Sequence, residues 1–419
     1  MSMTEIAFRG NRSSKGGMDS PAQSALRNKI PLWPNGRMRE SPSLWLLTNT
    51  PSPYQVEFFS AIHRSGEIAL DVRFMDLKHR GERWRPGKDN RFNYRVYRAL
   101  GRRGSGEYGF HPGAVREILA GRHDFYLLSG HYTSPTFLAC ALALCLSRKR
   151  WGLWLERPWP DDYRPAWASR ASARRPLARW ARNRLLRRLV KAAPRVLCIG
   201  TAASEAYRRL GAAPEKLFVL PYLCDTTRYQ AIDAVAVAEF RRQQGWGDKF
   251  VYLFSGQFIE RKGVDLLVAA FARLARERSD VALALLGDGP LRTGLLEGLE
   301  AELRPTVASP GHVPQADLPI WFAAADAFVF PSRHDGWGVV VNEACAAGLP
   351  IVTMDSVGAA HDLVIDGHNG FVLPRDDAEG LYQRMRWLAE HREEARAFGQ
   401  RSRELVGRFS LERGIALLK

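Results

Sequence analysis

The stretch RHDGWGVVVNEACAAGLPIV, residues 333–352, has the pattern of a turn, a short helix and the start of a strand. It follows the apolar run AFVFP, which is typical of a buried strand. Gly336 and Gly338 allow the backbone to turn tightly and to approach a ligand closely. Gly348 is the expected left-handed residue that ends the helix. This order of strand, glycine turn and helix predicts one βα unit of a parallel sheet.

Two carboxylates in this stretch point to a binding role. Asp335 is expected in the loop and Glu343 in the helix, eight positions later. They do not form a pair at fixed helical spacing, so we expect them to contact different parts of one elongated ligand. A carboxylate accepts two hydroxyl donors at once, which suits the vicinal hydroxyls of a sugar. The alternative, in which Asp335 caps the helix and Glu343 lies on the surface, stays open at this point.

The same alternation of apolar runs and amphipathic segments extends over almost the whole chain. Strands are expected at LWLLT, IALDVRFM, DFYLLS, WGLWLE, RVLCIG and LFVLPY, and in the second half at FVYLFSG, VALALLG, DAFVFPS, LPIVTM and GFVLP. Repeated βα units build parallel sheets with right-handed crossovers. Because 419 residues exceed one ordinary core, the sequence predicts two α/β domains. Ligands of such domains lie in the cleft beyond the carboxyl ends of the strands.

The composition is that of a globular protein, with 46% hydrophobic residues. Five cysteines without a CxxC pair predict reduced thiols rather than a structural zinc site. Residues 1–40 are polar and lack the apolar core of a signal peptide, so we expect a flexible tail. The longest apolar run, residues 137–147, is too short to cross a bilayer and is expected to form a buried helix. These features predict a cytoplasmic protein without a transmembrane anchor.

The net charge of +17 is concentrated in one segment. No acidic residue occurs between Asp162 and Glu205, and residues 164–195 are rich in arginine. Such a segment suits an anionic surface, so we expect peripheral contact with the inner face of a membrane. A solvated helix face is the alternative. The sequence contains no RNP signature, zinc finger or clear helix-turn-helix, so nucleic acid is not an expected partner.

A second cluster of candidate residues follows the strand FVYLFSG. The strand ends at Gly256, a loop carries Arg261 and Lys262, and Gly263 opens the next helix. Two cations beside a helix N-terminus form a natural clamp for a diphosphate. A solvent-exposed basic turn is the alternative. The turn at Gly287, after VALALLG, is a weaker signal of the same kind.

Together, the segments SGQFIERKG, LLGDGP, GHVPQADLPIWFAAADAFVFPSRHDGWGVVVNEACAAGLPIV and IDGHNGFVLP resemble the C-terminal domain of the family 4 retaining glycosyltransferases. The resemblance is dense over residues 250–375 and looser over 200–229 and 409–419. It implies the α/β GT-B fold, in which two Rossmann-like domains with parallel sheets face an interdomain cleft. The expected parts are a tail at 1–40, an acceptor-side domain at 41–225, a linker at 226–249, a nucleotide-sugar-binding domain at 250–404, and a last helix at 405–419 that packs back on the first domain.

The resemblance also assigns roles on the donor side. Glu343 takes the second position of the family's E-x7-E motif and is expected to bind the ribose. Asp335 takes the first position, one methylene shorter than the usual glutamate, and is expected to contact the donor sugar. Lys262 matches the family's phosphate clamp, whereas Gln257 stands where the family usually has arginine, with Arg261 as a candidate replacement. The expected donor-binding residues are Gly256, Gln257, Arg261, Lys262, Gly287, His312, Val313, Asp335, Gly336, Trp337, Gly338, Val339 and Glu343.

In the first domain, His131 stands in the place of the family's cleft histidine, with an ordinary polar loop as the alternative. We expect His131, Lys262 and Asp335 to be the catalytic residues. A structural ion pair of Glu156 with Arg157 is as open as a contact with acceptor. The expected acceptor-side residues are Ser52, Pro53, Tyr54, Glu156 and Arg157.

The activity that the resemblance implies is transfer of a sugar from a nucleotide-diphosphate sugar to a hydroxyl, with retention. The acceptor would be a glycan or lipid-linked glycan of cell-envelope or exopolysaccharide synthesis. No DxD-type metal signature occurs in a suitable loop, so no metal or other cofactor is expected. Two alternatives stay open, a sugar-nucleotide epimerase of the same fold and a non-catalytic scaffold that binds polyanions or membrane. Gln257 and Asp335 slightly favour the scaffold.

Overall fold

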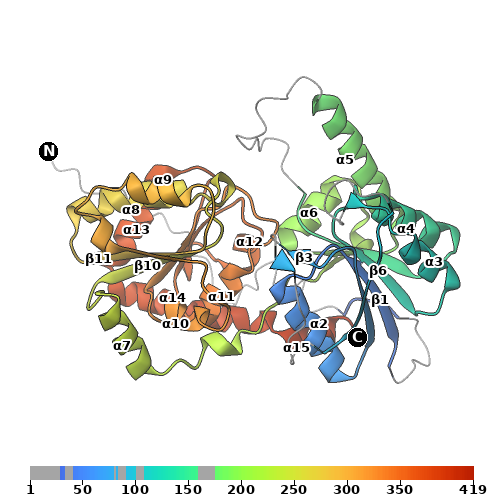
Figure 1. Ribbon diagram of the computed structural model, residues 1–419, viewed down its shortest axis with the longest axis horizontal. Coiled ribbons are helices and arrows are strands. Elements are labelled where there is room, and N and C mark those ends of the chain that lie inside the picture. The colour runs from blue at the N-terminus through green and yellow to red at the C-terminus, as the bar shows by residue number, and fades with distance from the viewer. Residues whose placement is uncertain (1–28, 34–40, 80–81, 84–90, 101–107, 159–174) are drawn as a thin grey trace, which may run out of the picture.

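The computed structural model describes residues 29–33, 41–79, 82–83, 91–100, 108–158 and 175–419, and these form two α/β lobes (Figure 1). The first lobe has a parallel sheet in the order β5-β2-β1-β6-β7-β8-β9. Its strands are β1 (Ser43–Thr48), β2 (Ala69–Phe74), β5 (Asn93–Val96), β6 (Phe125–Ser129), β7 (Trp151–Leu155), β8 (Val196–Cys198) and β9 (Leu217–Val219). Its helices are α2 (Pro53–Ser65), α3 (Pro112–Ala120), α4 (Pro135–Leu146), α5 (Arg175–Ala192) and α6 (Thr201–Arg209). A short antiparallel pair, β3 (Lys78–His79) and β4 (Glu82–Arg83), lies apart from this sheet.

The second lobe has a parallel sheet in the order β12-β11-β10-β13-β14-β15. Its strands are β10 (Phe250–Ser255), β11 (Val281–Leu286), β12 (Val307–Gly311), β13 (Ala327–Phe330), β14 (Ile351–Met354) and β15 (Gly370–Leu373). Its helices are α7 (Ala234–Gln243), α8 (Val264–Glu277), α9 (Arg292–Glu297), α10 (Leu318–Ala323), α11 (Val340–Ala347), α12 (Ala360–Leu363), α13 (Ala378–Glu390) and α14 (Arg392–Val406). The central strands are buried and apolar except for the half-buried Ser255 at the end of β10, as a parallel sheet with both faces covered requires. The predicted fold class, two α/β domains with parallel sheets, is confirmed.

The edge strand β5 was not expected from the sequence. Its residues NYRV are exposed or half-buried, because this strand pairs on one side only. Edge strands are short and polar as a rule, so the apolar pattern that marks central strands is missing here.

The helix α4 also differs from expectation, because Leu142 and Leu146 are 61% and 75% exposed. The apolar run at 137–147 is therefore buried on one face only.

The last helix, α15 (Leu411–Leu417), crosses to the first lobe and packs on α2 (Figure 1). A Cβ atom at Gly414 would collide with Leu223 and Phe58, so the helix lies very close to that lobe. Trp33 donates a hydrogen bond from its indole Nε1 to the carbonyl of Leu418 over 2.7 Å. The described residues 29–33 of the expected flexible tail are therefore packed, which corrects the prediction there. Their apolar side chains Ile30, Leu32 and Trp33 are all buried. The rest of the tail lies outside the described residues.

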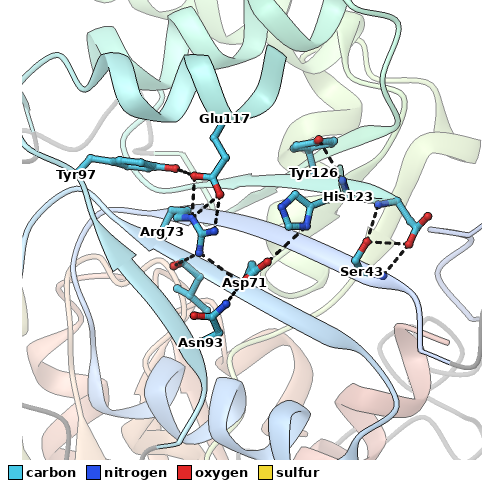
Figure 2. Close-up of polar contacts among 10 residues, drawn as sticks. Ser43, Asp71, Arg73, Asn93, Tyr97, Glu117, His123 and Tyr126 are labelled. Atoms are coloured by element: carbon cyan, nitrogen blue, oxygen red, sulfur yellow. Dashed lines mark hydrogen bonds and ion pairs between the residues drawn. The ribbon is translucent and has the colours of Figure 1, made fainter. Parts of the chain in front are cut away.

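A polar network joins one end of the first sheet to α3 (Figure 2). The buried guanidinium of Arg73, on β2, forms a two-pronged ion pair with Glu117 on α3. Tyr97 donates to the same carboxylate, and Asp71 lies 3.6 Å from both Arg73 and His123. Burial would raise the pKa of Glu117, but the hydrogen bonds from Arg73 and Tyr97 outweigh it and lower the pKa to about 2. The ion pair of Arg73 with Glu117 therefore ties α3 to β2.

Candidate active site

Three neighbouring strands of the second sheet, β11, β10 and β13, end at the same edge and carry the predicted donor loops. After β10 and β11 the chain approaches itself so closely that a Cβ atom at Gly287 would collide with the carbonyl oxygen of Gly256. Gly287 also has a positive φ of 126°, a conformation that favours glycine. Its N–H donates to the carbonyl of Gly311 at the end of β12, over 2.8 Å. The glycine turns therefore hold the strand ends together as a compact platform.

Lys262 is buried at this platform and forms an ion pair with Asp335. The ammonium group also lies 5.0 Å from the centre of the Phe330 ring. Gly263, with a φ of 68°, ends the short 3₁₀ turn Glu260–Lys262 and opens α8. A Cβ at that position would collide with the carbonyl of Pro331, so the lysine loop packs directly on the loop after β13. Local backbone packing thus brings Lys262 and Asp335 together from strands that are far apart in sequence.

The half-buried carboxylate of Asp335 is held in its charged form. Burial would raise its pKa, but Lys262 and then Arg261 act on it with positive charge and lower the pKa below its usual value. Arg261 also ties the two loops together, donating from Nη1 to the carbonyl of His334 over 2.8 Å. Asp335 does not cap α11, whose N-terminal residue Val339 has no side-chain cap. The capping alternative is therefore wrong.

Glu343 lies in the first turn of α11 and is half-buried. It faces Tyr229 of the expected linker rather than Lys262. Its carboxylate lies near Tyr229, Arg228 and Glu57. Burial is the largest cause that raises the pKa of Glu343, to about 7. The helix ends at Ala347 with Gly348 at a φ of 78°, as predicted. The two carboxylates of the opening stretch thus have different neighbours, as the expectation of two separate contact points required.

The remaining donor-side candidates lie around the same edge in different settings. Gln257 and Val339 are half-buried, His312 is exposed, Val313 is buried, and Gly338 has a φ of 91°. The indole of Trp337 is buried, and a Cβ at Gly200 of the other lobe would collide with it. The ring also donates from Nε1 to Asn342 Oδ1 over 3.0 Å. It therefore belongs to the packing between the lobes, and only the backbone of Trp337 is left for a ligand.

Glu156 faces this cluster from the end of β7 in the first lobe. A Cβ at Gly336 would collide with the Glu156 carboxylate, so only glycine lets the two lobes approach here. Glu156 is exposed in the cleft, but its partial enclosure between the lobes raises its pKa, and the negative charge of Asp335 raises it further. Arg261 and His131 are close enough for their charges to oppose this shift. The three predicted catalytic residues therefore converge around one carboxyl group, since Lys262 is bound to Asp335.

His131 follows β6 and is exposed on the first-lobe side of the cleft. Its ring stacks on Tyr108 with centroids 5.5 Å apart and an angle of 15°. The backbone N–H of His131 donates to Asn49 Oδ1 over 3.1 Å. Gly130, with a φ of 106°, lies so close to the Asn49 amide that a Cβ would not fit. The loop that presents His131 is thus fixed by β1 as well as by β6.

Behind His131 and Glu156 the first lobe contains a cavity of about 670 Å³. Ser52, Tyr54, Glu156 and Arg157 line it, as expected for the acceptor side. Pro53 is not among the lining residues and is exposed at the start of α2. The sequence did not single out several other lining residues, because they stand outside any motif; among them are Tyr108, Tyr132, Arg182, Tyr207 and Tyr222.

Three hydrogen bonds join the lobes around the cleft. Arg157 donates from Nη1 to the carbonyl of Asp355 over 3.2 Å, and the N–H of Thr201 donates to Asp362 Oδ2 over 2.9 Å. Gln315 donates to Glu57 Oε1 over 2.6 Å. Arg157 thus reaches across the cleft to the second lobe.

Within the described part of the chain, no group of three or more His, Cys, Asp or Glu side chains is arranged to hold a metal ion. In the same residues, no helix has both the length and the apolar character that a membrane crossing requires.

Comparison with known proteins agrees with this geometry. Residues 237–405 match the model of the family described as glycosyl transferases group 1. Over 200 residues the chain is 31% identical to the alpha-D-kanosaminyltransferase of Streptomyces kanamyceticus, which covers 48% of this chain and 51% of the relative. Over 170 residues it is 35% identical to the GDP-mannose-dependent alpha-(1-6)-phosphatidylinositol monomannoside mannosyltransferase of Mycolicibacterium smegmatis, covering 39% and 44%. The chain thus spans about half the length of the curated relatives it matches.

Solved structures resemble the chain over nearly its whole length. HepE of Anabaena in complex with UDP superimposes with a TM-score of 0.69 at 18% identity, covering 89% of this chain and 97% of that one. WaaG, a glycosyltransferase involved in lipopolysaccharide biosynthesis, superimposes with a TM-score of 0.61 at 18% identity, covering 90% of this chain and 99% of that one. At these identities the likeness shows the fold. Residues 237–405 therefore belong to the glycosyl transferases group 1, and the chain that carries them has the GT-B fold.

Proposed function

We propose that the protein transfers a glycosyl group from a nucleotide-diphosphate sugar to an acceptor hydroxyl, with retention at the anomeric carbon and without a metal ion. The ion pair of Lys262 with Asp335 carries this proposal. It lies where three strand ends meet, opposite Glu156 and His131 of the other lobe. A cation beside a helix N-terminus binds a diphosphate, and a neighbouring carboxylate accepts sugar hydroxyls.

Lys262 and Arg261 supply the charge that the reaction needs. As the bond between the anomeric carbon and the diphosphate oxygen breaks, negative charge grows on the departing diphosphate. Positive groups that are already in place stabilise this charge without reorganising. Lys262 is paired with Asp335, so an incoming diphosphate has to share or displace this contact.

Retention follows if the acceptor oxygen bonds to the anomeric carbon on the face that the diphosphate leaves. The acceptor proton then passes to the departing phosphate oxygen, so no enzyme nucleophile is needed. This is the route that the family 4 pattern suggests. Asp335 and His131 would hold the sugar between the leaving group and the acceptor, and Glu343 would bind the ribose at the hinge side.

The acceptor that we propose is a glycan or lipid-linked glycan. The names of relatives support this class: one is a phosphatidylinositol monomannoside mannosyltransferase, and another is the lipopolysaccharide core biosynthesis glycosyltransferase LpsE of Rhizobium meliloti. A neighbouring structure was determined with UDP-glucose, which supports a nucleotide sugar as donor.

We further propose that the exposed side of α5 contacts an anionic membrane. Arg184, Arg187 and Arg188 are exposed on this helix together with Trp180, which is 58% exposed. Residues 159–174 of the expected basic stretch lie outside the described residues. Salt-dependent binding to vesicles with 30 mol% phosphatidylglycerol should weaken when these three arginines become glutamine. Neutralising Lys249, Arg396 and Arg408 of the second lobe is the matched control; equal loss in both variants would refute the contact.

The function is tested by incubating the protein with UDP, GDP, ADP and TDP sugars and measuring released nucleoside diphosphate. We expect turnover of at least one donor, and a large loss in Lys262→Ala. Lys249→Ala is the matched control, because Lys249 precedes β10 at the opposite end of the strand from the lysine loop. Epimerised donor sugar in place of release would indicate the epimerase, and no donor binding at all would indicate the scaffold.

A further inference from the structure

The cavity of the first lobe has aromatic walls. Trp154, Tyr207 and Tyr222 are buried in it, and Tyr54 and Tyr132 are half-buried. Tyr54 and Tyr222 lie with ring centroids 4.6 Å apart, and Tyr222 with Trp154 at 5.5 Å. Aromatic faces and phenol hydroxyls together suit a sugar ring, which has apolar C–H faces and polar edges. Its volume of about 670 Å³ is large enough for more than one sugar unit.

One cationic side chain enters this cavity from the basic helix. Arg182 on α5 is half-buried and lines the cavity. Its Nε atom is enclosed by protein and has no hydrogen-bond partner among the residues that the structure describes. A buried guanidinium nitrogen without an acceptor is costly, because water no longer solvates it. Arg182 is also near enough to Tyr132 for its charge to act on that phenol.

Three other arginines of α5 have different surroundings. Arg184, Arg187 and Arg188 are exposed, and the guanidinium of Arg184 lies 5.3 Å from the Trp180 ring centre. Only Arg182 among these four lines the cavity. These four arginines are therefore of two kinds: Arg182 lines the cavity, and the other three are exposed to solvent.

The cavity is cationic overall. Arg157 lines it from β7, and Arg182 lines it from α5. Glu156 is the one acidic residue among those that the structure shows lining it, and it lies at the end that meets Asp335. An anion in the cavity would thus meet two guanidinium groups, whose planar donors match phosphate and carboxylate oxygens.

We propose that this cavity binds a glycosyl acceptor that carries an anionic group, a phosphate or a carboxylate, and that Arg182 recognises this group. That the bound molecule is a glycosyl acceptor rests on the proposed function, but the anion site is a property of the first lobe alone. The sugar ring lies against the tyrosine walls, with its reacting hydroxyl toward Glu156 and Asp335. Arg182 is a binding residue that sets acceptor specificity and takes no part in the bond that forms.

The test measures binding of small probes to the full chain by isothermal titration. Glucose, glucose 6-phosphate, glucose 1-phosphate and glucuronic acid are compared in the Lys262→Ala background, where the donor phosphate site is removed. We expect at least one anionic probe to bind about tenfold or more tightly than glucose. Arg182→Ala should remove this preference, and Arg182→Lys should keep part of it. Arg188→Ala, on the same helix but outside the cavity, should change nothing.

The probes separate the sources of the anion. Preference for glucose 1-phosphate indicates an anomeric phosphate of the kind that links glycans to lipids. Preference for glucose 6-phosphate indicates a sugar phosphorylated away from the anomeric carbon, and preference for glucuronic acid indicates a uronic acid. Equal binding of glucose and all anionic probes overturns the proposal even if Arg182→Ala does not fold. An unchanged preference in a folded Arg182→Ala also overturns it, as does an equal loss in Arg188→Ala. Failure of the glycosyl transfer proposal appears separately, as absence of donor turnover with anion binding intact.

Discussion

Two enclosed pairs of a cation with a carboxylate, one from each lobe, differ in what surrounds them. Arg73 and Glu117 lie between a strand and a helix, and Tyr97 and Asp71 complete their contacts (Figure 2). Lys262 and Asp335 lie at the ends of strands and face the other lobe. The first pair is saturated by protein groups, whereas the second lies at the mouth of the cleft.

This difference separates structural charge from functional charge. Buried pairs contribute to stability only when their polar atoms are satisfied, and removing one partner is then expensive. A pair at a cleft can exchange its partner for a ligand, so its loss should affect activity more than folding. In the second lobe, Asp335 holds Lys262 at the place where the proposed donor diphosphate would bind.

The largest effect is expected when Arg73 is removed. Arg73→Ala leaves Glu117 without its main partner and should lower the free energy of unfolding by about 3–5 kcal/mol. Chemical denaturation of wild type and variant measures this loss. Because the pKa of Glu117 is held at about 2, below its usual 4.5, the pair stabilises fully above pH 4.5 and this stabilisation fades as pH falls toward 2. Turnover per folded molecule should stay at the wild-type level; a large fall would give the first pair a functional role.

Lys262→Ala should have the opposite effect, a large loss of activity with a small loss of stability. We expect glycosyl transfer to fall about 10²–10³-fold, because a preorganised cation is lost from the leaving group. Stability should change by no more than about 1–2 kcal/mol, since Asp335 is reached from the cleft and can take up water or a proton. Steady-state kinetics and thermal melting on the same samples check both halves. A variant that melts early while its remaining folded fraction is fully active would reverse the assignment.

A smaller effect is expected at Asp335. Asp335→Asn removes the charge but keeps the shape, and should slow transfer about tenfold because sugar hydroxyls lose a charged acceptor. Asp335→Glu restores the length usual in the family motif and should change the preferred donor sugar more than the rate. Competition between pairs of donor sugars, analysed by mass spectrometry, measures this preference. Identical preferences in Asp335→Glu and wild type would remove Asp335 from sugar selection.

The smallest effect concerns the protonation of Glu343. A carboxyl with a pKa of about 7 is half protonated at neutral pH. Ribose hydroxyls donate to the ionised form, so binding should lower this pKa and release about half a proton at pH 7. The affinity for the nucleotide should therefore rise between pH 6 and 8. Titration calorimetry in buffers of different ionisation enthalpy counts the proton, and Glu343→Gln should abolish its release. Proton uptake instead would place the ribose elsewhere.

The sequence predicted the second lobe better than the first for a physical reason. The donor loops depend on glycines and charges at strand ends, and both leave local marks such as Gly263, Lys262 and Gly336. The cavity is built from residues such as Tyr132, Arg182 and Tyr222, which are distant in sequence and meet only through topology. The edge strand β5 was missed because exposure removes the apolar pattern, and the buried Trp337 ring because its partner Gly200 belongs to the other lobe.

The central claim is that Lys262 binds the diphosphate of the donor. The direct test is a thermodynamic cycle that compares UDP with UMP, and GDP with GMP, in wild type and Lys262→Ala. We expect the diphosphate to bind wild type at least tenfold more tightly than the monophosphate, and this preference to vanish in the variant. A preference for the diphosphate that is equally large in both proteins would contradict the account.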